Sequence, residues 1–296
     1  MMSSAHPASR RLASVLAAAT LGGCSTTGLL NAVEPAGGGA VTRDISFEGA
    51  GSRLKLDVYS PRPGPTPAPV VVFFYGGGWD SGRRSDYAFV GKALAARGYV
   101  AVIPDYRVYP EVRWPAFLED SARAVRWAKD HGGDYGGDPA RRVLMGHSAG
   151  AYNAAMLTLD HRWLGAVGLD PDRDLKAMVG LAGPYDFLPP HTDALRDIFG
   201  PADQRPDTQP IRHVTGGAPP LWLAADKGDT VVEAANSARL AAAVRAKGGQ
   251  VQERYYGGLN HALMIGTIAA PLRFLAPVLK EAAAFIDAHT RPGAPS

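Results

Sequence analysis

A tight turn between an apolar strand and a helix is the feature that most limits how this chain can fold. The turn is the pentapeptide Gly-His-Ser-Ala-Gly at residues 146–150, with an apolar run at 143–145 before it and small residues at 151–156 after it. Glycine is needed at both ends of such a turn because a larger side chain would clash there. The pattern predicts that Ser148 lies at the tip of a strand with a helix N-terminus behind it.

Strand-like and helix-like patterns alternate along most of the chain. The run at 70–74 is continuously apolar, as expected for a strand buried on both faces of a sheet. Strands that alternate with helices predict an α/β fold with a mostly parallel central sheet and helices on both faces. The predicted strands are 44–47, 54–59, 70–74, 100–104, 143–145, 177–181, 221–225 and 251–256, and the predicted helices are 87–97, 116–131, 234–247 and 275–289.

The length of 296 residues is enough for one large core. We predict a single domain over residues 41–290. The least periodic stretch, 183–220, contains one short helical pattern near 193–199 and is predicted to be a small cap over one wall of a pocket. Residues 291–296 are predicted to be a disordered tail.

The N-terminus has the pattern of a targeting segment. A short basic region precedes an apolar stretch at 12–21 that is too short to span a bilayer, and Leu-Gly-Gly-Cys follows, ending at Cys24. This resembles the lipobox of bacterial lipoproteins. The resemblance implies a signal peptide at 1–23, lipid on Cys24, a membrane anchor and, because Ser25 follows, an outer-membrane location in the bacterial envelope. Ordinary signal-peptide cleavage is the alternative, and residues 24–40 are expected to form a flexible tether.

Composition argues against several classes of partner. The net charge is +3, and removal of the first 23 residues leaves 29 basic and 28 acidic side chains, or +1. This balance gives no basic stripe for nucleic acid. Cys24 is the only cysteine, so an internal disulfide is impossible, and no Cys/His cluster has metal-ligand spacing. We therefore predict no metal and no cofactor. The sequence does not indicate an oligomeric state.

A serine hydroxyl attacks a carbonyl efficiently only when a base removes its proton. Eight histidines are available. The tight turn is expected to direct His147 away from its neighbour Ser148. His261 follows the last predicted strand and so reaches the same sheet edge as Ser148, which makes it the predicted base. The loop after 221–225 supplies the acid that orients the base: we predict Asp229, with Asp226 as the alternative.

A negatively charged intermediate needs backbone donors. Three glycines follow the strand at 70–74, and they allow bare N–H groups to approach a substrate oxygen. We predict that Gly77, Gly78 and the N–H of Ala149 form this oxyanion hole. Aromatic residues near these loops suggest a pocket for an apolar acyl or aryl group: Trp79, Tyr106, Tyr185 and Phe187, with Trp114 equally consistent with core packing.

The order of glycine-rich loop, Ser148, Asp229 and His261 resembles the α/β-hydrolase superfamily, near its hormone-sensitive-lipase-like and arylformamidase-like groups. Residues 75–79, Tyr-Gly-Gly-Gly-Trp, are similar to the His-Gly-Gly-x-Trp oxyanion motif of that superfamily. Tyr75 departs from the usual histidine, so the loop must be anchored by a different hydrogen bond. Asp226 stands where the family has glycine three residues before the acid.

These residues predict a serine carboxylesterase that cleaves small to medium esters through an acyl-enzyme. An arylformamidase-like amide hydrolase is the alternative enzyme, since both reactions share one intermediate. The alternative from another class is a lipid-anchored binding protein that keeps the hydrolase fold without catalysis. The expected partners are a small-molecule ester and, through Cys24, a membrane.

Overall fold

The computed structural model describes residues 26–37, 39–49, 52 and 54–291. Within these residues eight strands form one sheet in the spatial order β1-β2-β4-β3-β5-β6-β7-β8. Only β2 runs antiparallel to its neighbours, so the prediction of a mostly parallel α/β sheet is confirmed. The strands are β1 (Val41–Ser46), β2 (Lys55–Tyr59), β3 (Ala68–Phe74), β4 (Val100–Pro104), β5 (Gly137–His147), β6 (Ala177–Leu181), β7 (Leu221–Asp226) and β8 (Val251–Tyr256).

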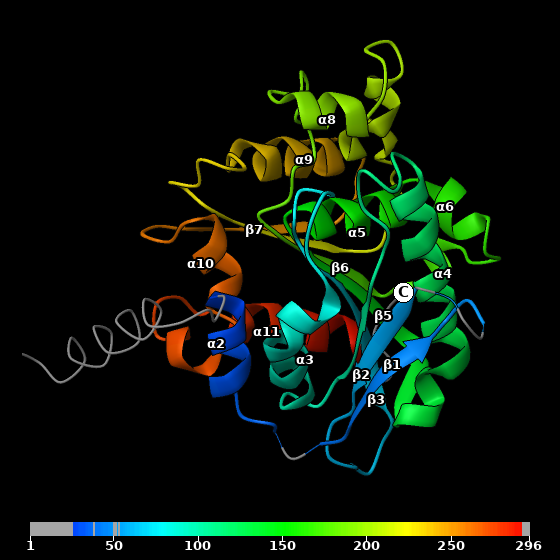
Figure 1. The fold of residues 1–296 in the computed structure, drawn as a ribbon, viewed down its shortest axis with the longest axis vertical. Coiled ribbons are helices and arrows are strands. Elements are labelled where there is room, and N and C mark those ends of the chain that lie inside the picture. The colour runs from blue at the N-terminus through cyan, green and yellow to red at the C-terminus, as the bar shows by residue number, and fades with distance from the viewer. Residues whose placement is uncertain (1–25, 38, 50–51, 53, 292–296) are drawn as a thin grey trace, which may run out of the picture.

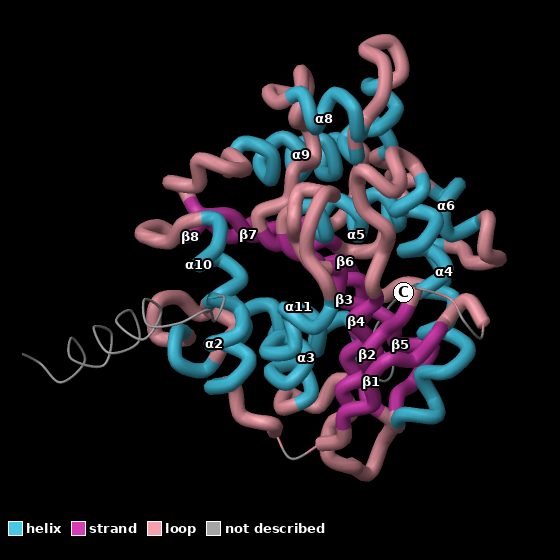
Figure 2. The backbone as a smooth tube through the Cα atoms, viewed as in Figure 1, coloured by secondary structure: helices cyan, strands magenta, loops and turns pink. Residues whose placement is uncertain are grey.

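Helices cover both faces of the sheet (Figures 1 and 2). α3 and α11 pack on one face, and α4, α5 and α9 pack on the other. The α-helices are α2 (Thr26–Val33), α3 (Ala88–Ala95), α4 (Ala116–His131), α5 (Ala149–Leu159), α6 (His161–Gly165), α7 (Pro171–Asp174), α8 (Asp193–Ile198), α9 (Ala235–Ala246), α10 (His261–Gly266) and α11 (Val278–Thr290), and the 3₁₀ helices are η1 (Arg84–Tyr87), η2 (Gly132–Tyr135), η3 (Arg205–Thr208), η4 (Pro210–His213) and η5 (Ala270–Leu272).

The sequence pattern explains why the centre of the sheet is so deeply buried. Every residue of β4 and β6 is buried, because these strands are covered by helices on both sides. Helix α4 matches its predicted bounds: Leu118, Ala122 and Val125 lie on its buried face, and the helix ends at His131, with Gly132 as its C-cap. The sheet therefore provides a rigid base for the loops that follow its parallel strands.

The carboxyl ends of β3, β5, β7 and β8 lie along one edge of the sheet. The glycine loop follows β3, Ser148 follows β5, Asp229 follows β7 and His261 follows β8. Parallel strands bring their carboxyl ends to the same side, which is where α/β proteins form their sites. The sheet thus gathers four segments that are far apart in the sequence.

The N-terminal segment differs from the predicted flexible tether. Residues 26–33 form helix α2, and Leu30 is buried against the body. The Asn31 side chain accepts a hydrogen bond from the Phe89 N–H at 2.8 Å and donates one to the Ser85 carbonyl at 2.8 Å. These contacts hold the segment on α3 and η1, so the expectation of a free tether over 24–40 is wrong for the helix.

Several predictions from the sequence fall outside the described residues. These are the signal peptide at 1–23, the lipidated Cys24 and residues 292–296 of the predicted tail. In the part of the chain that is described, no helix is both long enough and apolar enough to cross a bilayer. The least periodic stretch, 183–220, contains α8, η3 and η4, and α8 lies beyond α9 at the top of Figure 1.

Candidate active site

The Ser148 turn has the strained geometry that its sequence predicts. Ser148 has φ 54° and ψ −124°, a backbone conformation that is unfavourable for a residue with a side chain. A Cβ on Gly146 would lie 2.2 Å from the Gly150 carbonyl oxygen, and one on Gly150 would lie 2.1 Å from the Phe74 carbonyl oxygen. Both glycines are therefore required for the turn to close against β3.

The structure brings Ser148, His261 and Asp229 into one chain of hydrogen bonds. The His261 Nε2 atom lies 2.8 Å from Ser148 Oγ, and His261 Nδ1 lies 2.8 Å from Asp229 Oδ2. Asp229 is fully buried at its side chain, whereas the His261 side chain is 15% exposed. This arrangement suits a neutral imidazole that donates its Nδ1 proton to the carboxylate and accepts the serine proton at Nε2.

Hydrogen bonds from backbone N–H groups hold the Asp229 carboxylate and distinguish it from Asp226, the alternative acid. Asp229 Oδ1 accepts hydrogen bonds from the N–H groups of Val231 and Val232, which leaves Oδ2 for His261. Asp226 uses both carboxylate oxygens on backbone: one accepts from the Gly228 N–H and the other from the Leu259 N–H. Asp226 thus joins the acid loop to the loop that carries the histidine.

His147 contacts His261, the predicted base, and the sequence did not indicate this contact. Its Nε2 lies 3.1 Å from the His261 carbonyl oxygen, and the two imidazole rings are 4.9 Å apart. Burial, with repulsion from His261 as a smaller cause, lowers the pKa of His147 to about 3. A neutral ring with the proton on Nε2 therefore donates to the backbone of His261. No sequence pattern distinguishes this role from that of an ordinary buried histidine.

The glycine loop approaches Ser148 at contact distance. A Cβ on Gly76 would lie 3.0 Å from Ser148 Cβ, and one on Gly77 would lie 2.2 Å from the Ser81 carbonyl oxygen. Gly77 and Gly78 have positive φ values of 145° and 62°. Gly78 and Ala149 line the same cavity as Ser148, whereas Gly77 is not among its lining residues. Two of the three residues predicted to supply oxyanion donors thus line the cavity that Ser148 also lines.

Tyr75 anchors the glycine loop in place of the usual histidine. Its ring lies between those of Tyr87 and Tyr106, with centroid separations of 5.7 Å and 4.6 Å and near-parallel planes. Its hydroxyl donates to Asp105 at 3.3 Å, while the Tyr106 hydroxyl donates to the Tyr75 carbonyl at 2.7 Å. Burial raises the pKa of Tyr75, so it stays a neutral donor. Stacked rings and hydrogen bonds together hold the start of the loop.

A cavity of about 470 Å³ opens beside Ser148. Of the four aromatic residues predicted for the pocket, Trp79 and Phe187 line it. The prediction is wrong for Tyr106 and Tyr185, which are not among the lining residues: Tyr185 is fully buried, and the Tyr106 hydroxyl donates to the Tyr75 carbonyl. Trp114 lines a different surface depression. The cavity residues are Gly78, Trp79, Ser148, Ala149, Pro184, Asp186, Phe187, Leu188, His191, Leu195, Thr230, Val231, Val232, Glu233, Asn236 and Arg239.

Trp79, one of the residues that line this cavity, is held by contacts on several sides. It has a positive φ of 62°, and its Nε1 donates to Asn153 Oδ1 at 3.1 Å. Its ring packs edge-on against Tyr152 and lies 6.0 Å from the ring of Phe187. The indole is therefore held by two residues of α5, and its ring also stacks with Phe187 of the cap segment.

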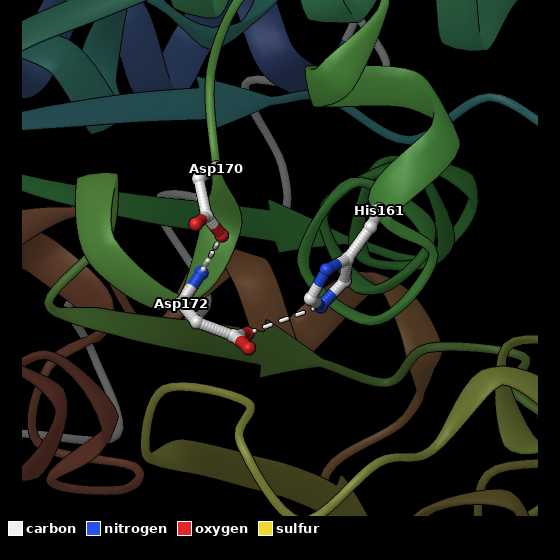
Figure 3. A group of neighbouring side chains, drawn as sticks. All are labelled: His161, Asp170 and Asp172. Atoms are coloured by element: carbon white, nitrogen blue, oxygen red, sulfur yellow. Dashed lines mark hydrogen bonds and ion pairs between the residues drawn. The ribbon is translucent and has the colours of Figure 1, made fainter.

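Among the described residues, one group has the geometry to approach a metal ion: His161, Asp170 and Asp172 (Figure 3). Asp170 accepts a hydrogen bond from the Asp172 N–H at 3.1 Å, and Asp172 pairs with His161 at 3.1 Å. These residues lie after α5 and before β6, toward the amino ends of the strands, away from Ser148. The group is accounted for as a helix cap and a surface ion pair.

Comparisons with known proteins find similarity to esterases. The sequence profile of the BD-FAE family matches residues 56–244. The chain is 34% identical over 196 residues to esterase LipC of Mycobacterium tuberculosis, covering 60% of this chain and 48% of LipC. It is 36% identical over 150 residues to a probable isoprenylcysteine alpha-carbonyl methylesterase of Oryza sativa, covering 50% of this chain and 36% of that protein. The chain thus spans less than half the length of these curated relatives.

Solved structures of similar fold cover more of the chain. The apo form of Thermogutta terrifontis esterase 2 has a TM-score of 0.68 and 25% identity, covering 85% of this chain and 95% of that structure. A truncated carbohydrate esterase from gut microbiota has a TM-score of 0.73 at 19% identity, covering 88% and 98%. The second comparison establishes the α/β-hydrolase fold alone.

Proposed function

This chain belongs to the BD-FAE family, and from that membership and the contacts of Ser148 we propose that it is a serine carboxylesterase for small to medium esters. One observation carries the proposal: the unbroken chain of two 2.8 Å contacts from Ser148 through His261 to Asp229. The matching relatives that are named as esterases support the same reaction class.

In the proposed mechanism, Ser148 Oγ attacks the ester carbonyl carbon while its proton moves to His261 Nε2. Asp229 stabilises the imidazolium that forms, and the N–H groups of Gly78 and Ala149 stabilise the oxyanion. His261 then protonates the departing alcohol, which leaves an acyl group on Ser148. A water molecule, deprotonated by His261, attacks this acyl-enzyme and releases the carboxylic acid.

A Ser148→Ala variant tests the proposal directly. We expect kcat for a p-nitrophenyl ester to fall by roughly four to six orders of magnitude, because the nucleophile is lost. A fluorophosphonate probe is expected to label the parent protein at Ser148 and to leave the variant unlabelled. Circular dichroism of both proteins checks that the variant folds.

The same assay separates the alternatives. Faster turnover of N-formylkynurenine than of any p-nitrophenyl ester would favour an arylformamidase. Folded parent protein that neither reacts with the probe nor cleaves an ester would favour a binding protein without catalysis.

We also propose that Cys24 carries a lipid anchor that places the enzyme at the bacterial cell envelope, with the outer membrane favoured. The support is the Leu-Gly-Gly-Cys sequence that ends at Cys24 after a short apolar stretch. Mass spectrometry of the N-terminal peptide from cell membranes tests it: we expect Cys24 to be the first residue and to be acylated.

A further inference from the structure

The described part of helix α2 starts at Thr26, two positions after Cys24 in the sequence, and it is attached firmly to the body. Asn31 bonds to the backbone of Ser85 and Phe89, and Lys92 Nζ donates to the Asn31 carbonyl at 2.6 Å. Two residues of extended chain reach at most about 7 Å. An acyl group on Cys24 would therefore keep the start of α2 close to the bilayer that holds it.

The segment around α2 exposes almost no charge. Glu34 is the only charged residue between 26 and 40. It is 3% exposed, accepts a hydrogen bond from the Ala270 N–H and pairs with Arg273. The one carboxylate is thus turned inward and neutralised, and the outer side of α2 is left uncharged.

Exposed apolar side chains gather at the same place. Across the described residues four large apolar side chains are exposed, and three of them flank the Glu34–Arg273 pair. Val33 is 45% exposed, Phe274 is 68% exposed and Leu275 is 38% exposed. Val33 ends α2, while the other two follow η5, and the ion pair holds these segments together. Large apolar side chains grouped on a surface mark an interaction site.

We propose that α2 and the Phe274–Leu275 segment form a membrane-contact surface whose occupant is the phospholipid bilayer that holds the anchor. The proposal rests on the proposed acylation of Cys24. Helix α2 is about 12 Å long, so Val33 at its end stays within about 20 Å of the acyl attachment. An uncharged helix and an exposed phenyl ring at that distance suit the interface between headgroups and acyl chains.

This surface would also set the orientation of the active site. Figure 1 shows α2 beside α10, the helix that begins with His261, whereas α8 of the cap lies well apart from α2. With α2 on the bilayer, helix α8 of the cap would lie farther from the lipid than helix α10.

A fluorescent label at position 274 tests the surface in the full chain. Because Cys24 is the only cysteine and is acylated in the proposal, a Phe274→Cys variant would carry one free thiol. The labelled protein is placed in vesicles of phosphatidylethanolamine and phosphatidylglycerol, with and without brominated acyl chains. An Asp203→Cys variant, with its label on the exposed cap, is the matched control.

We expect the label at position 274 to be quenched by the brominated lipid and to be at least about twofold less accessible to aqueous iodide than the label at position 203. If acylated protein shows equal iodide accessibility at the two positions, the proposed membrane-contact surface is wrong, while the proposed lipid anchor on Cys24 stands. A free Cys24 thiol in membrane-derived protein overturns the anchor and the surface with it. Ester turnover by both variants shows that they are folded and tests the catalytic proposal separately.

Discussion

The two walls of the cavity beside Ser148 are built in different ways. On one wall Ser148 lines the cavity, and His261 and Asp229 lie behind it. All three follow strands of the sheet, are buried or nearly so, and are joined by hydrogen bonds. On the other wall Phe187 is half-buried and His191 is exposed, and both come from the cap segment. The comparison teaches that reactivity depends on groups held by the sheet, whereas substrate choice depends on the cap segment, which is held separately from them.

The two walls also differ in which groups their supporting hydrogen bonds hold. Asp226 ties the acid loop to the Leu259 backbone, and His147 bonds to the His261 carbonyl. These contacts fix the positions of the loops that carry Asp229 and His261. The cap wall is held by ring packing, such as Phe187 on Phe199 with centroids 5.1 Å apart, and by hydrogen bonds that do not reach the catalytic groups, such as the Phe187 N–H to Gln209 Oε1 at 2.9 Å. We expect substitutions to have large effects on turnover at the first wall and small effects on selectivity at the second.

The largest effect in this comparison is expected at Asp229. Asp229→Asn should lower kcat by roughly three to four orders of magnitude, because an amide favours the wrong tautomer of His261. Asp226→Asn is the matched variant on the same loop. It should lower the free energy of unfolding by about 1–3 kcal/mol through a lost backbone hydrogen bond, with a much smaller loss of kcat. Steady-state kinetics and urea unfolding measure the two effects.

A larger loss of kcat in Asp226→Asn than in Asp229→Asn would contradict this assignment. It would mean that the hydrogen bond from the Leu259 N–H to Asp226 matters more for turnover than the contact between Asp229 and His261.

The sequence predicted the first wall better than the second, for a physical reason. Parallel strands place their carboxyl ends at one edge, so the order of Ser148, Asp229 and His261 along the chain implied their meeting. The prediction of Tyr106 and Tyr185 as pocket residues rests on their being aromatic and near the predicted site. Their side chains pack inward, and local sequence does not determine that direction. The α2 segment was expected to be a tether because its composition is small and polar; its contacts are with Phe89 and Arg273, far away in the sequence.

Substitution of His147 tests whether the position of His261 depends on the hydrogen bond between His147 and the His261 carbonyl. His147→Leu should lower kcat by roughly tenfold to a hundredfold with KM little changed, because the donor to the His261 carbonyl is lost and the base shifts. His147→Gln keeps an N–H donor and should recover part of the rate. Equal rates in the parent and both variants would show that the contact has no part in positioning the base.

The same residue gives a pH dependence with a definite sign. In the folded protein the pKa of His147 is lowered to about 3, while the unfolded chain has the ordinary value of 6.5. The unfolded state therefore binds the proton first, so stability is lost as the pH falls from 6.5 toward 3. We expect the unfolding free energy to fall by roughly 1 kcal/mol per pH unit between pH 6 and 4 from this group. That component should be absent in His147→Leu, as urea titrations at each pH would show.

Phe187 is expected to give the smallest effect and to define the second wall. Phe187 lines the cavity and its ring stacks near Trp79, and its hydrogen bond is to Gln209 rather than to a residue of the chain at Ser148. Phe187→Ala should lower kcat/KM for a longer acyl ester by roughly three- to tenfold while leaving the acetate ester almost unchanged, since only apolar contact with the substrate is lost. Trp114→Phe, outside the cavity, is the control. A series of p-nitrophenyl esters of increasing length measures the ratio, and an equal loss for every ester would mean that Phe187 positions the catalytic groups rather than the substrate.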